Sequence, residues 1–351
     1  MTLSRAQLAM IERARSVGGG DQGVALTDEA CAFLVATLAH DLSVPASEVH
    51  IPPDLPDFFA KVHPETLVLK HRDFLKDLGV ILDRIKDADS YFACLAKLHK
   101  SRLKYQRILE RQPLPTMDQV GPRGLLQYGH LSPPSLAGLL FWRKWFFDID
   151  NRAGQETGYL FEPIIALSIG GVPVSAKKSP VHRHADRTKG RQVDCIKGKL
   201  AYEFKIRVTI AASGQGRWAE ELSFPRDATH SGYQPILVVF DPTSNRKLDE
   251  LVKVFQDEGG ETYVGEGAWA HLEKQAGRTM ARFLEKYVRA PLADLLKSAG
   301  ADLPRLQAEL TGERLSIRIG DDTLSVNREP GPLDDSGDAL PDDVDEEVGG
   351  P

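Results

Sequence analysis

Cysteine is scarce in this sequence: its 351 residues include three, Cys31, Cys94 and Cys195, and these lie far apart. Such a small, odd set excludes a disulfide framework and a cysteine-based metal site, and it predicts a reducing compartment, the cytoplasm. No apolar run is long enough to span a bilayer, and the charged residues 1–16 lack the apolar segment of a signal peptide. The composition, 42% hydrophobic and 27% charged, predicts a soluble globular protein with no membrane association.

Basic charge is also in the minority, since 44 Lys and Arg face 50 Asp and Glu and give a net charge of −6. A negative net charge disfavours nucleic acid as a partner. However, eight of the acidic residues lie in residues 330–351, which contain no Lys or Arg, so residues 1–329 carry +2. The acidity belongs to a tail that we expect to be disordered. Its default role is solubility; the alternative is competition with DNA for a basic cleft.

The first third of the chain has the apolar spacing of helices, predicted over 27–42 with Thr27 as N-cap, over 64–86 and over 89–111. Residues 112–134 contain five prolines and three glycines, which predicts an irregular connection and a domain boundary. We expect a helical N-terminal region at 1–130, a catalytic core at 131–260, a C-terminal helix and hairpin at 261–329, and the tail at 330–351.

After residue 134 the pattern changes to alternating helices and strands. The predicted helices are 136–149, 155–167, 216–222, 245–256 and 268–296, the last broken near Pro291. The predicted strands are 193–196, 200–210 and the apolar 235–240, followed by a hairpin of 315–319 with 323–326. This order predicts an α/β fold whose central mixed sheet is flanked by helices.

The most informative segment is a predicted hairpin whose strands are separated by Gly198-Lys199, a loop typical of a type II′ turn. That register places Asp194 directly opposite Glu203, with Cβ atoms about 4.5–5.5 Å apart. Lys205 lies two residues after Glu203 and therefore on the same face, while Phe204 points into a core.

Two opposed carboxylates repel each other, and a divalent cation between them would turn the repulsion into ligation. Asp194, Glu203 and Lys205 form the residue set for metal-assisted hydrolysis of a phosphodiester. The simpler alternative is an exposed hairpin with a local Glu–Lys pair.

These residues resemble the PD-(D/E)xK nuclease superfamily, whose pattern is an Asp on one strand and Glu-x-Lys or Asp-x-Lys on the next. Val193 stands where a proline often precedes the Asp. Members often carry a further Glu on an upstream helix, and the best match is Glu162, with Glu156 as the alternate. The resemblance covers residues 152–242, including the apolar strand after the motif.

Within this superfamily the chain resembles the type II restriction endonucleases in length and organisation, and by general similarity the ApaLI-like members. The resemblance implies one or two Mg²⁺ per site held by Asp194, Glu203 and Glu162, with Lys205 assisting attack of water. It also implies a homodimer that cuts double-stranded DNA at a short site, and a cognate methyltransferase that acts on the same site without a stable complex. The alternatives are a repair or junction-resolving nuclease and a non-catalytic DNA-binding protein on the same fold.

The local charge favours DNA as the substrate, because residues 177–207 hold ten Lys and Arg against three acids. We expect contacts to the DNA backbone from Lys177, Lys178, Arg183, Arg187, Lys189, Arg191 and Arg207.

The same stretch contains His182-x-His184-x-Asp186, which resembles the start of a zinc-hydrolase pattern. Arg187 stands where that pattern continues with His, so we favour a surface or DNA-facing loop. For three further features we favour a structural role. The basic residues of 97–111 are expected to form a solvated helix face, with phosphate contact as the alternative. The aromatic residues of 141–147 are expected to form core or a dimer interface, and Glu220 or Glu221 is expected to belong to a structural helix.

Overall fold

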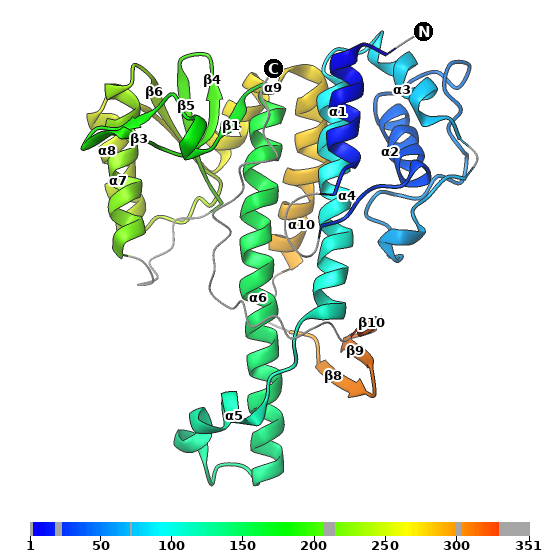
Figure 1. Ribbon diagram of the computed structural model, residues 1–351, viewed down its shortest axis with the longest axis vertical. Helices are drawn as coiled ribbons and strands as arrows, with labels where there is room; N and C mark the ends of the chain where they lie inside the picture. Colours follow the sequence, from blue (N-terminus) through cyan, green and yellow to red (C-terminus); the bar gives the residue numbers. More distant parts are fainter. Residues whose placement is uncertain (1–2, 18–22, 71, 207–214, 299–302, 330–351) are drawn as a thin grey trace.

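The chain is organised along one long helix, α6 (Pro133–Ser168), which runs through the length of the molecule (Figure 1). The computed structural model describes residues 3–17, 23–70, 72–206, 215–298 and 303–329. A sheet lies on one side of α6 and the N-terminal helices lie on the other (Figure 1). The predicted acidic tail and Arg207 lie outside the described residues.

The first third is helical, as predicted, but the single helix predicted over 64–86 is wrong: the structure has a short 3-10 helix at Pro64–Thr66 and a separate α-helix at Phe74–Leu82. Thr27 accepts a hydrogen bond from the Ala30 N–H and caps α2, which confirms the predicted N-cap. The helices are α1 (Arg5–Arg15), α2 (Asp28–Asp41), η1 (Pro64–Thr66), α3 (Phe74–Leu82) and α4 (Ala88–Arg111). The basic side of α4 is bonded to the protein itself: Lys100 donates to the Ser16 carbonyl at 2.7 Å, and Arg107 donates to the Gly23 carbonyl at 2.6 Å. These bonds favour the structural interpretation of that face.

Residues 112–134 are less irregular than predicted, since they include α5 (Met117–Val120) and η2 (Gly121–Gln127). The two helices predicted at 136–149 and 155–167 are one continuous helix, so the predicted break was wrong. Gly154 lowers helix propensity by only about 1 kcal/mol, which the packing of α6 against its neighbours outweighs. The prolines at 133 and 134 occupy the first turn, where a missing N–H costs nothing.

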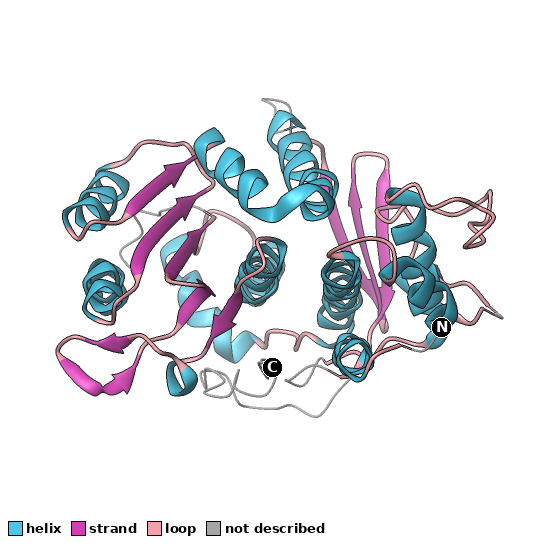
Figure 2. Ribbon diagram, turned by 90° about the horizontal axis from the view of Figure 1, so that it is seen from above, coloured by secondary structure: helices cyan, strands magenta, loops and turns pink. Residues whose placement is uncertain are grey.

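The sheet is mixed, which confirms the predicted fold class. Its order is β1-β4-β5-β6-β7: β1, β4 and β5 pair antiparallel, whereas β5, β6 and β7 run parallel. The strands are β1 (Val172–Val174), β4 (Val193–Lys197), β5 (Leu200–Lys205), β6 (Gln234–Val239) and β7 (Glu261–Val264). The parallel crossovers are α7 (Gln215–His230) and α8 (Arg246–Asp257), which cover one face of the sheet (Figure 2).

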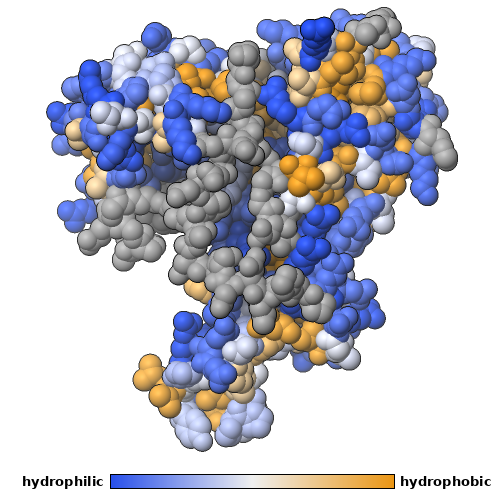
Figure 3. All heavy atoms as spheres, viewed as in Figure 1, coloured by the Kyte–Doolittle hydropathy of each residue, from blue (hydrophilic) through white to orange (hydrophobic). Residues whose placement is uncertain are grey.

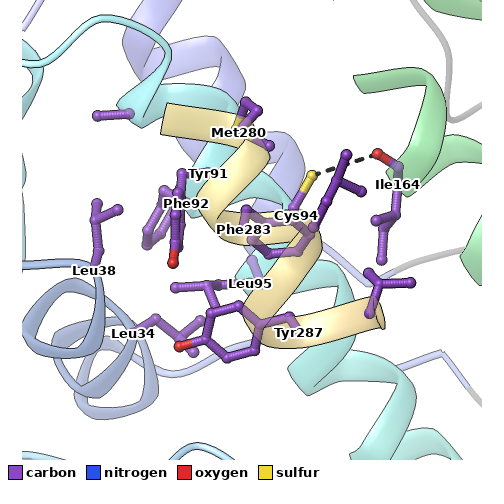
Figure 4. Close-up of a cluster of buried hydrophobic side chains, with 14 of the residues drawn as sticks. Leu34, Leu38, Tyr91, Phe92, Cys94, Leu95, Ile164, Met280, Phe283 and Tyr287 are labelled. Atoms are coloured by element: carbon purple, nitrogen blue, oxygen red, sulfur yellow. Dashed lines mark hydrogen bonds between the residues drawn. The ribbon is translucent and has the colours of Figure 1, made fainter. Parts of the chain in front are cut away.

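The other face of the sheet joins the largest buried cluster. Tyr202 and Phe204 of β5 belong to the same cluster as side chains of α2, α4, α6 and α9 (Glu266–Leu284). Figure 4 shows its centre, where Tyr91, Phe92 and Cys94 of α4 meet Met280 and Phe283 of α9. The three cysteines are buried free thiols. No helix in the described ranges is long and apolar enough to cross a membrane.

The C-terminal part differs from its prediction in detail. The helix predicted at 268–296 is interrupted at Gly277, which has a φ of 69°, and by the π-helical turn η4 (Glu285–Arg289), while Pro291 lies in the first turn of α10 (Ala290–Ser298). The predicted hairpin is present and has a third strand: β8 (Leu306–Thr311), β9 (Arg314–Ile319) and β10 (Asp322–Asn327). Trp145 of α6 is fully buried in one cluster with Leu315 and Ile317, so this part of the aromatic segment is core, whereas Phe147 is 56% exposed.

A buried carboxylate ties the N-terminal helices to the C-terminal ones. Asp41, at the end of α2, accepts hydrogen bonds from the hydroxyl of Tyr91 at 2.9 Å and from the hydroxyl of Tyr287. Lys286 pairs with the same carboxylate, whose side chain is 1% exposed. One side chain of α2 therefore satisfies two buried hydroxyls and one ammonium on α4 and η4.

We expect Asp41→Ala to destabilise the protein by about 3 kcal/mol, because two buried hydroxyls and Lys286 lose their shared partner. The exposed Asp54→Ala is the control, and we expect it to change stability by less than about 0.5 kcal/mol. Urea unfolding measures both. Equal stabilities for the two variants would contradict the role given to Asp41.

Candidate active site

The two opposed carboxylates lie on the β4–β5 hairpin in the predicted register. Cys195 pairs with Tyr202, Ile196 with Ala201 and Lys197 with Leu200, so the next pair along the strands is Asp194 with Glu203. Gly198 has a φ of 60° at the first loop position, as a type II′ turn requires. The turn chemistry therefore fixes which two acids face each other.

Asp194 is further held by the backbone of the neighbouring strand. Its Oδ2 accepts a hydrogen bond of 2.8 Å from the Phe204 N–H. Phe204 is 2% exposed and points into the main cluster, as predicted, so the strand cannot rotate to relieve the carboxylates. The site is thus positioned by packing on the opposite face of β5.

Lys205 lies between two carboxylates. Its Nζ is 2.8 Å from Glu203 Oε1 and 3.3 Å from Glu221 Oε1, and the three side chains are 20%, 15% and 21% exposed. Glu221 comes from α7, the helix that crosses over after β5. The strand face and the crossover helix together hold the ammonium in place.

The electrostatics of Asp194 show that the site is crowded with negative charge. Burial raises the pKa of Asp194 well above its usual range, and the carboxylates of Glu203 and Glu162 raise it further. The ammonium of Lys205 and the Phe204 N–H act in the opposite direction. Burial lowers the pKa of Lys205, but Glu203, Glu221 and Asp194 raise it by more, so the net pKa lies above the usual value.

The structure separates the two candidates for the upstream glutamate. Glu162, near the C-terminal end of α6, is close enough to Asp194 to raise its pKa. Its neighbour Phe161 packs edge-on against Phe240, with ring centroids 5.1 Å apart, which fixes this turn of α6 against the end of β6. Glu156 instead pairs with Lys104 of α4 at 2.8 Å. Glu162 therefore lies near Asp194, whereas Glu156 supports helix packing.

The donor set fits a hard divalent cation. Asp194 of β4 and Glu203 of β5 offer oxygen ligands on one face of the sheet, with Glu162 nearby. No group of three or more His, Cys, Asp or Glu side chains among the described residues forms a complete protein cage for an ion. Two carboxylates completed by waters and substrate phosphate are the usual arrangement for Mg²⁺.

The predicted DNA contacts lie on one projecting unit beside α7. Lys177 and Lys178 form the exposed end of η3 (Ala176–Lys178), and Arg183, Arg187 and Lys189 lie on the hairpin of β2 (His182–Arg183) and β3 (Asp186–Gly190). Arg183 is 2.9 Å from Glu220 of α7, and Lys189 is 3.3 Å from Asp186. The structure therefore brings five of the seven predicted contacts together.

Arg191 differs from these residues because it is buried, with 8% of its surface exposed. Its Nη1 donates to Asp227 Oδ2 at 2.7 Å and to Ser223 Oγ at 3.0 Å, and its guanidinium lies over the ring of Phe224. These bonds fasten the start of β4 to α7, so we give Arg191 a positioning role and leave it out of the proposed DNA contacts.

Asp227 also holds the histidine that the zinc interpretation requires. Its Oδ1 lies 2.9 Å from His184 Nδ1 and accepts the His184 N–H at 2.8 Å. Asp186 instead accepts hydrogen bonds from Thr188. The His-x-His-x-Asp segment thus anchors the basic hairpin on α7 and does not assemble a zinc centre among the described residues.

The sequence pattern did not identify two residues that hold the site and its surroundings in place, Glu221 and Asp227. Glu221 is separated from Lys205 by 16 positions, and the adjacent Glu220 offered an equal choice. Asp227 lies on a helix with no motif to mark it. The topology offers one signal for Glu221. A helix that connects β5 to a parallel neighbouring strand begins near the C-terminal end of β5, where Lys205 lies.

The mixed sheet flanked by helices, with Asp194, Glu203 and Lys205 at adjacent strands, defines a restriction-endonuclease-like core. The family model described as "ApaLI-like restriction endonuclease" matches residues 61–289, and the chain belongs to that family. The type II restriction enzyme ApaLI of Acetobacter pasteurianus is 53% identical to it over 268 residues, which cover 72% of this chain and 71% of that protein. No solved structure matches the chain. Membership confirms the predicted class, a type II restriction endonuclease.

We expect Glu162→Gln to lower the pKa of Asp194, because it removes a negative charge that raises this pKa. Glu156→Gln is the matched control and should leave the pKa of Asp194 unchanged, since Glu156 is engaged by Lys104. Carbon NMR of labelled aspartate side chains in metal-free protein measures both. The same pKa of Asp194 in wild type and Glu162→Gln would remove Glu162 from the site.

Proposed function

We propose that this protein cuts both strands of duplex DNA at a short defined sequence, as a homodimer in a restriction–modification system. The observation that carries the proposal is that Asp194, Glu203 and Lys205 lie together on one face of the sheet. Beside them is the segment 177–189, which is rich in Lys and Arg. A cognate methyltransferase would act on the same sequence, with no stable complex between the two proteins.

Asp194 and Glu203 would hold one or two Mg²⁺ ions, with Glu162 completing the ligand or water network. When bound, Mg²⁺ supplies positive charge to the phosphate and acidifies a water molecule. The β4–β5 register holds both carboxylates at the site before any substrate arrives, which lowers the cost of reorganisation.

Lys205 provides positive charge next to the scissile phosphate. Its ammonium has three N–H groups, so it can keep its contacts with Glu203 and Glu221 and still donate to a phosphate oxygen or to the attacking water. Glu221 fixes the direction in which Nζ points. The basic unit at residues 177–189 would bind the DNA backbone and leave base recognition to other contacts.

We expect Asp194→Ala and Lys205→Ala each to lower the rate of cleavage of plasmid DNA by Mg²⁺-loaded protein at least about 100-fold. Affinity for the same DNA, measured without divalent ions, should stay within about threefold of wild type, because the backbone contacts remain. Asp54→Ala, which alters an exposed carboxylate outside the sheet and the basic hairpin, is the control and should cut normally.

Cleavage at the wild-type rate by both variants would overturn the site. Discrete fragments from wild-type protein support the proposed function, whereas smears or a preference for branched DNA would indicate a repair or junction-resolving nuclease. Binding with no cleavage in Mg²⁺ or Mn²⁺ would indicate a non-catalytic DNA-binding protein.

We expect Lys177→Ala with Lys178→Ala to weaken DNA binding and to make its salt dependence shallower. The slope of log affinity against log salt should fall by about 2, since each phosphate contact contributes about 0.9. A double change of the exposed Lys253 and Lys297 to Ala removes the same charge elsewhere and should leave the slope unchanged. Equal slopes in all three proteins would exclude the two lysines as phosphate contacts.

A further inference from the structure

The connection between α4 and α6 forms an arm, residues 112–140, which comprises α5, η2 and the first two turns of α6. The arm projects from the lower end of the molecule, away from the sheet (Figure 1). Val120, Leu136 and Leu140 form a small buried cluster of its own. Gly124 lies so close to α6 that a Cβ there would be 2.8 Å from Leu140 Cδ1. The arm is therefore docked on its own helix in one defined arrangement.

The arm exposes several large apolar side chains. Leu126 is 92% exposed, Leu125 76% and Tyr128 70%. Met117, Leu131 and Leu139 of the arm are each about 43–45% exposed. Hydrophobic side chains at the lower end of the molecule are visible in Figure 3. A rigid, projecting group of large apolar side chains is typical of a protein–protein interface.

The charge of the arm distinguishes between partners. Between Arg111 and Arg143 the only charged residues are Asp118 and Arg123, in a chain that is 27% charged. DNA binding requires several Lys or Arg to neutralise phosphates, and this segment offers one basic residue against one acidic residue. A neutral surface with one charge of each sign does not repel its own copy, as a two-fold interface demands.

We propose that the arm is the interface through which two copies of this chain associate, with Leu125, Leu126 and Tyr128 at its centre. The proposal rests on the proposed function, in which a homodimer brings one Asp194–Glu203–Lys205 site to each of the two strands. It adds the surface on which the dimer forms and the residues at its centre.

The length of α6 constrains how the two copies are arranged. Pro133 and Glu162 are 29 positions apart, which corresponds to about 44 Å along the helix. Two arms that met end to end in line would separate the sites by about twice that distance. A two-fold axis that runs roughly along α6 instead places both sites at the same end of the dimer.

The oligomeric state of the full chain tests this interface. In metal-free buffer without DNA, we expect sedimentation to show a dimer for wild type, and at least about 30-fold weaker self-association for Leu125→Glu with Leu126→Glu. The control is Leu295→Glu with Leu296→Glu on α10, where the leucines are 70% and 75% exposed. We expect this control to remain a dimer, and all three proteins to give the same circular dichroism spectrum.

Cross-linking provides a second measurement that does not depend on a destabilised interface. Cys31, Cys94 and Cys195 are buried, so a bismaleimide should react at an introduced thiol first. We expect Leu126→Cys to give a covalent dimer and Leu303→Cys, on the 86% exposed residue beyond α10, to stay monomeric.

Three results would overturn the arm interface. The first is a wild-type protein that sediments as a monomer both with and without DNA. The others are dissociation of the α10 variant while the arm variant stays dimeric, and a covalent dimer from Leu303→Cys but not from Leu126→Cys. The interface is also overturned if the arm variant loses DNA affinity while its oligomeric state is unchanged, because the arm would then be a DNA surface. A dimer through the arm that cuts no DNA would refute the proposed function and keep the interface, while normal cutting by a monomer would refute the interface alone.

Discussion

The mutual repulsion of Asp194 and Glu203 is the constraint on which the rest of this structure depends. The hairpin turn at Gly198 places the two carboxylates opposite each other, and Phe204 on the reverse face prevents the strand from moving them apart. Burial raises the pKa of Asp194 and the carboxylates of Glu203 and Glu162 raise it further, whereas Lys205 and the Phe204 N–H act in the opposite direction. The fold stabilises this arrangement by burying both faces of the sheet, one against α7 and α8 and the other against the main helical cluster.

The helices around the sheet supply side chains to the site and to the basic hairpin beside it. The crossover helix α7 brings Glu221 to Lys205, and through Asp227 it also anchors the basic hairpin and Arg191. The helix α6 brings Glu162 to the site near its C-terminal end and carries the apolar arm at its N-terminal end. A single helix thus fixes the distance between the proposed cleavage site and the proposed dimer interface.

The sequence predicted the site better than it predicted its surroundings, for physical reasons. Strand pairing follows from turn chemistry and two-residue alternation, which are local, so Asp194, Glu203 and Lys205 were placed together correctly. The continuity of α6 depends on packing against α4 and the sheet, which overrides the low propensity of Gly154, and the break predicted there was wrong. The partners of Glu221, Asp227 and Asp41 lie on elements distant in sequence, and no local pattern identifies them. The division into domains remains a prediction.

The stability of Asp194→Asn in metal-free buffer at neutral pH tests the central claim most directly. Asn keeps the shape of the side chain and an oxygen that accepts the Phe204 N–H, but it removes the charge that Glu203 and Glu162 oppose. An acid whose pKa is raised by folding destabilises the folded state when it is ionised. Urea unfolding should therefore show that the variant is more stable than wild type. A variant less stable than wild type would show that the two carboxylates do not repel each other as described.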